Sequence, residues 1–216
     1  MRTSVGSLFH ALASFALATF LAPVPAVAQD AAPPSVAEVD PDALLDEAFE
    51  LLVTDVEEAQ SAFIAAARLL PPERATEVVQ LANLLFRLPP EPGRVLAAAE
   101  LAARQGGGAS AAQALAAADS FPDPTRAVLL AHAARMADRA DRAELAASFR
   151  ERLLEELAEQ PEASEAALEL ARHLALRPEG VARAVEVLEE LITSRPNAAV
   201  TPTARVELER LRRGGS

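Results

Sequence analysis

Residues 161–202 read PEASEAALELARHLALRPEGVARAVEVLEELITSRPNAAVTP, and this stretch decides the fold that we expect. Pro161 and Pro196 bracket two apolar-periodic segments, and the breaker Arg177-Pro178-Glu179-Gly180 separates them. Proline interrupts a helix because it lacks the amide hydrogen, and glycine does so because it loses more backbone entropy than any other residue. The stretch therefore predicts a helical hairpin of about 35 residues.

The second helix of this hairpin is amphipathic. The first is predicted over 164–176 with Ser164 as its N-cap, and the second over 181–194. In the second helix, apolar residues recur at the i, i+3, i+4 and i+7 spacing that places them on one face. They are Val181, Ala184, Val185, Leu188, Leu191 and Ile192. The opposite face carries Arg183, Glu186, Glu189 and Glu190.

Helix breakers recur along the chain. They stand at Pro89-Pro90, Pro122 and Pro124, Pro161 and Pro196, at intervals of roughly 33 to 37 residues. Each interval holds two predicted helices, and a helix pair of this size must stack on neighbours to bury its apolar face. The predicted helices cover about 41–53, 55–70, 72–87, 92–105, 109–119, 124–137, 141–159, 164–176, 181–194 and 202–212. The first two are also compatible with one bent helix.

Several predicted helix starts carry capping residues. Asp40-Pro41, Asp123-Pro124 and Thr201-Pro202 each combine a side chain that can accept a first-turn N–H with proline at the first helical position. Thr54 with Glu57, and Asp141 with Glu144, have the spacing of a capping box.

The first 28 residues have the anatomy of a secretory signal peptide. Arg2 supplies positive charge, an apolar run extends from Leu8 to Leu21, and Ala26-Val27-Ala28 presents small residues to a signal peptidase. The run is short for a membrane-spanning helix, which needs about 20 residues. An uncleaved N-terminal anchor is the alternative. We expect a signal peptide at 1–28, a flexible leader at 29–40, a helical repeat domain at 41–216, and a periplasmic or otherwise extracytoplasmic location.

Composition and motifs argue against several functions. The formal net charge of −12 repels nucleic-acid phosphates, and the absence of Cys, Trp and Tyr removes thiol chemistry and most stacking platforms. Neither His132 nor His173 is followed four residues later by a histidine or carboxylate that could complete a helical metal site, so we expect both on a helix surface or half-buried. Gly106-Gly107-Gly108 predicts a turn, because no phosphate-binding pattern follows it. We predict no catalytic residue, cofactor or metal.

A family resemblance rests on the hairpin and the residues after it. The matching positions are Leu168, Ala171, Ala184, Leu188, Leu191 and Pro196, then Arg195 to Ala198, Thr201 to Ala204, and Leu208. On these residues the segment 161–208 resembles the tetratricopeptide repeats of bacterial cell-envelope proteins. Over 41–160 the likeness rests on helix-pair periodicity. The resemblance implies an all-α, right-handed α-solenoid of about four to five helix hairpins.

The resemblance also implies a binding surface. In tetratricopeptide folds the first helix of each pair lines a groove, so Glu169, His173 and Arg177, each one turn apart, are predicted to contact a bound protein or peptide. A polar outer face without a partner is the alternative. The acidic charge favours a basic partner.

The expected function is that of an exported, non-catalytic protein–protein interaction scaffold, in cell-envelope assembly, with no membrane span after signal cleavage. Two alternatives stay open: a secreted hydrolase or its accessory subunit, and a structural helical domain held by an uncleaved anchor.

Overall fold

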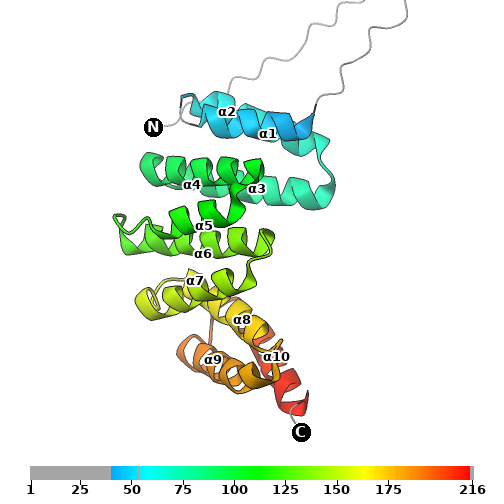
Figure 1. Cartoon of the computed structure of the whole chain (residues 1–216), viewed down its shortest axis with the longest axis vertical. Helices are drawn as coiled ribbons and strands as arrows, with labels where there is room; N and C mark the ends of the chain where they lie inside the picture. Colours follow the sequence, from blue (N-terminus) through cyan, green and yellow to red (C-terminus); the bar gives the residue numbers. More distant parts are fainter. Residues whose placement is uncertain (1–39, 53, 215–216) are drawn as a thin grey trace, which may run out of the picture. The chain divides into compact units, whose positions relative to one another are not determined.

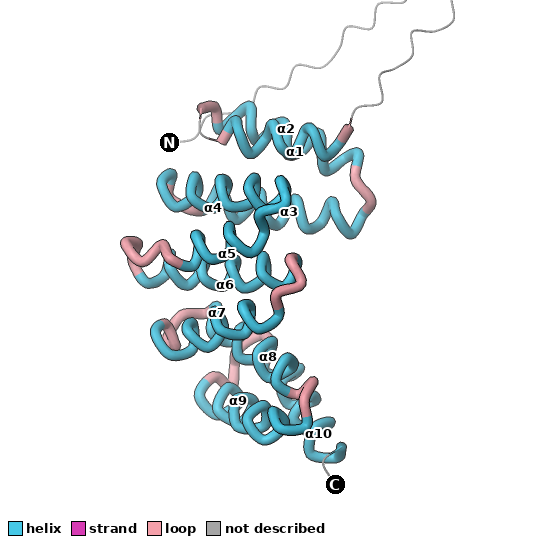
Figure 2. The backbone as a smooth tube through the Cα atoms, viewed as in Figure 1, coloured by secondary structure: helices cyan, strands magenta, loops and turns pink. Residues whose placement is uncertain are grey.

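The computed structural model describes residues 40–52 and 54–214, and this described part contains helices and turns without β-strands (Figure 2). The all-α prediction is confirmed. The chain divides into two units, residues 1–38 and 39–216, and all described residues belong to the second. The predicted signal peptide and the leader up to residue 39 lie outside the described residues.

The helices follow one another with short connections (Figure 1). Their bounds are α1 Pro41–Leu51, α2 Val56–Leu69, α3 Pro72–Arg87, α4 Pro90–Ala102, η1 Ala103–Gly107, α5 Gly108–Ala116, α6 Asp123–Arg139, α7 Ala143–Glu156, α8 Glu162–Leu174, η2 Pro178–Gly180, α9 Val181–Ser194 and α10 Thr201–Gly214. The η1 segment contains a kink at the predicted glycine turn, because Gly106 leaves helical backbone angles there, and η2 is a 3₁₀ turn at the predicted breaker. Because α1 ends before α2 begins, the alternative of one bent helix is wrong.

Two of the expected helix starts show how local chemistry sets a boundary. Asp40 caps α1 as predicted, since its carboxylate accepts the N–H of Asp42 at 2.9 Å. At α2 the cap lies one residue later than the predicted Thr54–Glu57 box: Asp55 accepts the N–H of Glu58 at 3.0 Å. The Thr54 hydroxyl donates instead to the preceding helix end.

Two other capping predictions are wrong, because neither Asp123 nor Asp141 stands at the N-cap position of its helix. Helix α6 begins at Asp123 itself, whose carboxylate pairs with Arg126 at 3.0 Å. Asp141 adopts φ 56°, a left-handed turn conformation that aspartate tolerates better than most residues, and α7 begins only at Ala143.

Ser164 and Thr201 are tied to the same residue instead of serving as caps. Helix α8 starts at Glu162, so Ser164 lies in its first turn, where its buried Oγ accepts from Arg195 Nη1 at 3.1 Å. The Thr201 hydroxyl donates to the Arg195 carbonyl at 2.7 Å. Arg195 thus joins the end of α9 to the starts of α8 and α10.

The apolar core forms two clusters that meet at α8. The first extends from α1 to the start of α8, and the second from the middle of α8 to α10. Ala163 and Ala166 belong to the first, whereas Leu168 and Ala171 belong to the second. On α9 the four predicted charged residues are exposed, and three of the six predicted apolar residues, Ala184, Leu188 and Leu191, are buried. The other three, Val181, Val185 and Ile192, are half-buried, and Val187, which was not assigned to this face, is buried, so the face assignment is confirmed in part.

Each helix packs against the next one in sequence, and four helices also contact a helix that is not their neighbour in the sequence. Helix α1 contacts α4, α4 contacts α6, and α6 contacts α8. We call α1, α4, α6 and α8 the first-helix row, because α4, α6 and α8 each open one of the predicted hairpins. Helix α3 lies between α2 and α4 in the chain and has a single fully buried residue, Leu85.

Candidate functional site

A glycine kink between α4 and α5 shapes a cavity that charged side chains line. Gly106 has φ 93°, a conformation that glycine adopts without the steric cost of a Cβ. A Cβ on Gly108 would lie 3.0 Å from the Cβ of Ala140, so the start of α5 approaches the end of α6 closely. The kink therefore brings the ends of α4 and α6 and the start of α5 around one space.

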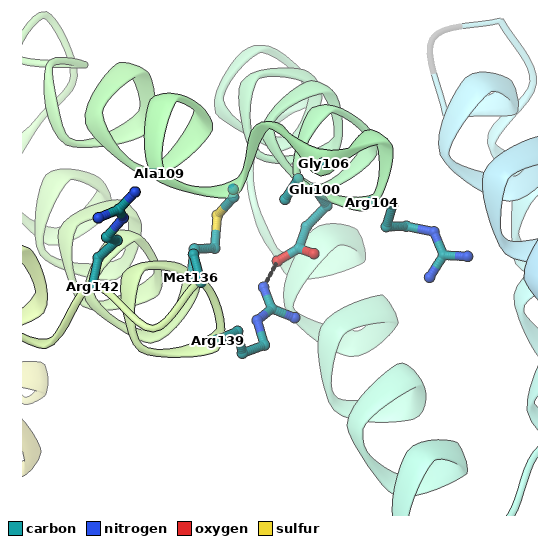
Figure 3. A pocket seen from close by; sticks show the side chains of 10 residues that line it. Glu100, Arg104, Gly106, Ala109, Met136, Arg139 and Arg142 are labelled. Atoms are coloured by element: carbon teal, nitrogen blue, oxygen red, sulfur yellow. Dashed lines mark hydrogen bonds and ion pairs between the residues drawn. The ribbon is translucent and has the colours of Figure 1, made fainter.

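This cavity has a volume of about 440 Å³. Charged side chains of α4, α6 and the turn after α6 lie around it, as Figure 3 shows. Met136 and small residues of α5 and α6 form its apolar part. The charged residues that line it are Glu100, Arg104, Arg139 and Arg142.

A buried carboxylate lies at this cavity. Glu100 is only 3 % exposed, and its Oε1 accepts hydrogen bonds from both His132 Nε2 and Arg139 Nη2. His132 is itself 6 % exposed, so the expectation of a surface or half-buried histidine is wrong. Its hydrogen-bond partner, Glu100, lies on α4, the neighbouring helix of the first-helix row, 32 residues earlier in the chain.

The hydrogen bonds determine the tautomer of His132. Arg135 Nη2 lies 3.3 Å from Nδ1, and since a guanidinium can only donate, Nδ1 accepts. The ring proton therefore resides on Nε2 and is donated to Glu100. Burial lowers the pKa of His132 and outweighs the nearby carboxylate, which would raise it, so the imidazole is neutral at pH 7.

Glu100 is ionised in the same environment. Burial alone would raise its pKa, but the hydrogen bond from His132 and the positive charge of Arg139 outweigh burial and hold the pKa below its usual value. The cluster therefore presents a buried carboxylate anion held by donors on one side.

The second oxygen of Glu100 is unused. Both hydrogen bonds that Glu100 receives from the described residues go to Oε1. Every fully buried polar side-chain atom in the described part of the chain has a hydrogen-bond partner. Oε2 accepts none from the described residues, so it reaches solvent.

The three arginines at the cavity differ in how far they are neutralised. Arg104 points away from Glu100 toward α1, where it pairs with Asp42 at 3.0 Å and Asp46 at 2.5 Å (Figure 3). Arg139 donates one N–H to Glu100, and its side chain remains 53 % exposed. Arg142 is exposed, and its guanidinium forms no hydrogen bond or ion pair with the side chains or carbonyls of the other described residues, whereas its backbone N–H donates to the Ala137 carbonyl at 2.9 Å.

A second depression lies beside the start of α8, with a volume of about 620 Å³. Arg195 lines this depression, and its guanidinium already donates hydrogen bonds to the carbonyls of Ala158 and Gln160 and to the hydroxyl of Ser164. The depression is also lined by Glu159, Glu165 and Asn197, so its remaining polar groups are acidic or neutral.

The predicted partner-binding residues lie at the end of α8 and just after it. His173 Nε2 is 3.7 Å from Glu144 Oε2, and Arg177 pairs with the same carboxylate. Glu169 pairs instead with Arg172 at 2.6 Å. The structure thus brings His173 and Arg177 together on Glu144 of α7, places Glu169 in a separate ion pair, and keeps all three away from the residues that line the cavity.

Sequence inspection missed the Glu100–His132 pair because it searched for histidine partners one helical turn away. The available signal was the repeat period: Glu100 precedes His132 by 32 residues, close to one interval between breakers. Arg177 and Glu144 are separated by 33 residues in the same way.

The residues that the structure describes contain neither a metal-binding cluster nor a membrane-spanning helix. No group of three or more His, Asp or Glu side chains is placed to hold a metal ion there. No helix of that part is both long and apolar enough to cross a bilayer.

Comparison with known proteins adds no identification. No protein-family model matches the chain, and neither a curated protein nor a solved structure is significantly similar to it.

Proposed function

We propose that the chain is an exported, non-catalytic protein-binding module built as a right-handed, tetratricopeptide-like α-solenoid. Its first helices form the face that receives a partner protein or peptide of basic character, in the periplasm or another extracytoplasmic space. Glu169, His173 and Arg177 belong to that face.

The direct packing of α1 on α4, α4 on α6 and α6 on α8 carries this proposal. Stacked helix pairs whose first helices adjoin produce an extended surface, and such surfaces are typically used to bind other proteins. The acidic balance of the chain supports a basic partner.

Co-purification from the native host tests the proposal. The tagged whole chain should retain one protein in stoichiometric amount, and charge reversal by Glu169→Arg should reduce its recovery because the proposed partner is basic. Glu186→Arg on α9 is the matched control, because Glu169 and Glu186 each pair with an arginine three residues away. Recovery of no partner, together with a hydrolytic activity that a point mutation abolishes, would favour the hydrolase alternative.

Export is tested separately. The exported protein should begin at Gln29, because Ala26-Val27-Ala28 presents the small residues that a signal peptidase recognises. N-terminal sequencing checks this. An exported chain that still carries Leu8 to Leu21 would establish the anchored alternative.

A further inference from the structure

Helix α3 carries more apolar surface than the fold of one chain covers. Eight of its 16 residues are apolar, yet only Leu85 is fully buried. Helix α10 has four apolar residues among 14, and three of them, Ala204, Leu208 and Leu211, are buried. At about 100° per residue, the apolar positions of α3 spread over more than half of its circumference, whereas a surface helix typically packs through a stripe of about 100°. The packing of α3 on α2 and α4 therefore leaves part of its apolar face uncovered.

Three leucines form one edge of this apolar face. Leu81, Leu84 and Leu88 follow one another at the i, i+3 and i+7 spacing, so they lie on one side of α3 and of the residue that follows it. Each packs against the first core cluster and is only half-buried. Glu77, one turn before Leu81, and Arg87 flank them and are exposed. We call Leu81, Leu84 and Leu88 the leucine edge.

We propose that the leucine edge is the interface of a two-fold symmetric dimer, in which α3 of one copy of the chain packs antiparallel on α3 of a second copy. Leu81 lies opposite Leu84 of the second copy, and Leu88 extends the apolar contact at each end. This register places Arg87 beside Glu77 of the second copy, and the symmetry forms that ion pair twice.

The charges of α3 favour a second copy of the chain as the occupant of the leucine edge. A two-fold interface must be complementary to itself. The N-terminal half of α3 carries Glu73 and Glu77, its C-terminal end carries Arg87, and the remaining charge, Arg74, is paired with Asp42 at 2.7 Å. Antiparallel packing therefore brings opposite charges together, whereas parallel packing would set Glu77 against Glu77.

Net charge supports the same choice. Helix α3 contains two glutamates and two arginines, so its formal charges balance, although the whole chain has a net charge of −12. Two copies of so acidic a chain repel each other over much of their surface, and they approach at lower cost where the charges balance. Helix α3 is not in the first-helix row, so the dimer and the proposed partner-binding face use different helices, and either proposal can fail without the other.

Sedimentation equilibrium of the purified whole chain tests the proposal. The wild type should sediment with twice the monomer mass and dissociate on dilution. Glu77→Arg and Arg87→Glu should each weaken the dimer about tenfold, because each variant sets like charges together at two symmetric positions. The double variant that carries both substitutions should recover the affinity of the wild type, because the exchanged charges pair again across the two-fold axis.

Arg205→Glu on α10 is the matched control. Arg205 is exposed, like Arg87, and forms no ion pair with the other described residues, so Arg205→Glu and Arg87→Glu change the net charge equally. Association should be unchanged in Arg205→Glu. The circular dichroism of all variants should match that of the wild type, because every substituted side chain is exposed.

Three results would overturn the proposal. A wild type that stays monomeric at about 100 µM would leave the leucine edge to a different protein. A dimer that is unaffected by both single reversals, or weakened equally by Arg205→Glu, would place the contact elsewhere on the chain. A double variant that associates no better than the single variants would exclude the antiparallel register.

Discussion

Leu188 and Glu189 are sequence neighbours with opposite surroundings. Leu188 is fully buried in the second core cluster, whereas Glu189 is exposed and pairs with Arg212 of α10 at 2.5 Å. Leu188→Asp should lower the free energy of unfolding by several kcal/mol, because an unpaired carboxylate would enter an apolar core. Glu189→Ala should cost about 0.5 kcal/mol or less, since exposed ion pairs contribute little. Chemical denaturation measures both values, and equal losses would refute the face assignment.

His132 gives the chain a pH-dependent stability. In the unfolded chain the imidazole binds a proton below about pH 6.5, whereas burial keeps it neutral to lower pH in the fold. The unfolded state then holds more protons, so stability should fall as the pH drops from 7 through 6.5. His132→Gln should lessen this slope, whatever its effect at pH 7. Unfolding measured at pH 7.0, 6.5 and 5.5 checks it, and identical slopes would contradict the neutral imidazole.

Glu100 should add a second loss of stability at lower pH. Its carboxyl binds a proton below about pH 4.5 in the unfolded chain but resists protonation in the fold, where its pKa is lowered. The contribution is present above that pH and is lost as the pH falls further.

Individual residues were predictable where local periodicity determines their environment. The buried and exposed faces of α9 follow from a 3.6-residue repeat that any amphipathic helix must obey. The pair between Glu100 and His132 does not follow from local spacing, because its two residues belong to different helices and meet only through packing. Burial of Glu100 also contradicts the usual preference of charged side chains for solvent, which its pairing with Arg139 overrides.

At the scale of elements, helix positions followed from proline, glycine and apolar periodicity, and most observed bounds lie within a few residues of those expected. The caps were less predictable. Ser164 and Asp123 are good N-cap residues by type, yet Ser164 accepts a hydrogen bond from Arg195 at the end of α9, and Asp123 pairs with Arg126 within α6 itself. Local propensity selects candidates, and packing between elements decides among them.

The junction between α8 and α9 depends on the absence of a side chain. A Cβ on Gly180 would lie 2.2 Å from the carbonyl oxygen of Leu174, closer than any van der Waals contact allows. Gly180→Ala should therefore force the two helices apart and cost about 1 to 3 kcal/mol. Gly214→Ala is the control, because a Cβ there meets no atom within 4 Å. Thermal unfolding should separate the two variants, and similar midpoints would show that the junction relaxes freely.

At the scale of the whole described unit, polar contacts between successive hairpins repeat at one interval. The partners in Glu100–His132, Asp119–Arg152 and Glu144–Arg177 are separated by 32 or 33 residues. The pair of Arg104 with Asp46 spans 58 residues, because α3 is inserted between α2 and α4. The sequence predicted α3 as a helix but not as an insertion, since periodicity within a helix carries no information on which neighbours it contacts.

The proposed binding face makes a kinetic prediction once co-purification has supplied a partner. Exposed charges steer association, and salt screens them beyond roughly 8 to 10 Å at physiological ionic strength. Glu169→Arg should slow association with a basic partner by a factor of about two to ten at low salt, and the difference should shrink as salt rises.

Glu186→Arg on α9 is the matched control for that experiment. Glu169 and Glu186 each pair with an arginine three residues away in the chain, at 2.6 and 2.9 Å, but only Glu169 lies on a helix of the first-helix row. Reversal at Glu186 should therefore change the association rate less. Equal slowing of association by both variants would mean that the effect comes from the net charge of the chain and not from the position of Glu169. A rate insensitive to salt and to Glu169→Arg would mean that the partner binds a surface other than the first-helix row.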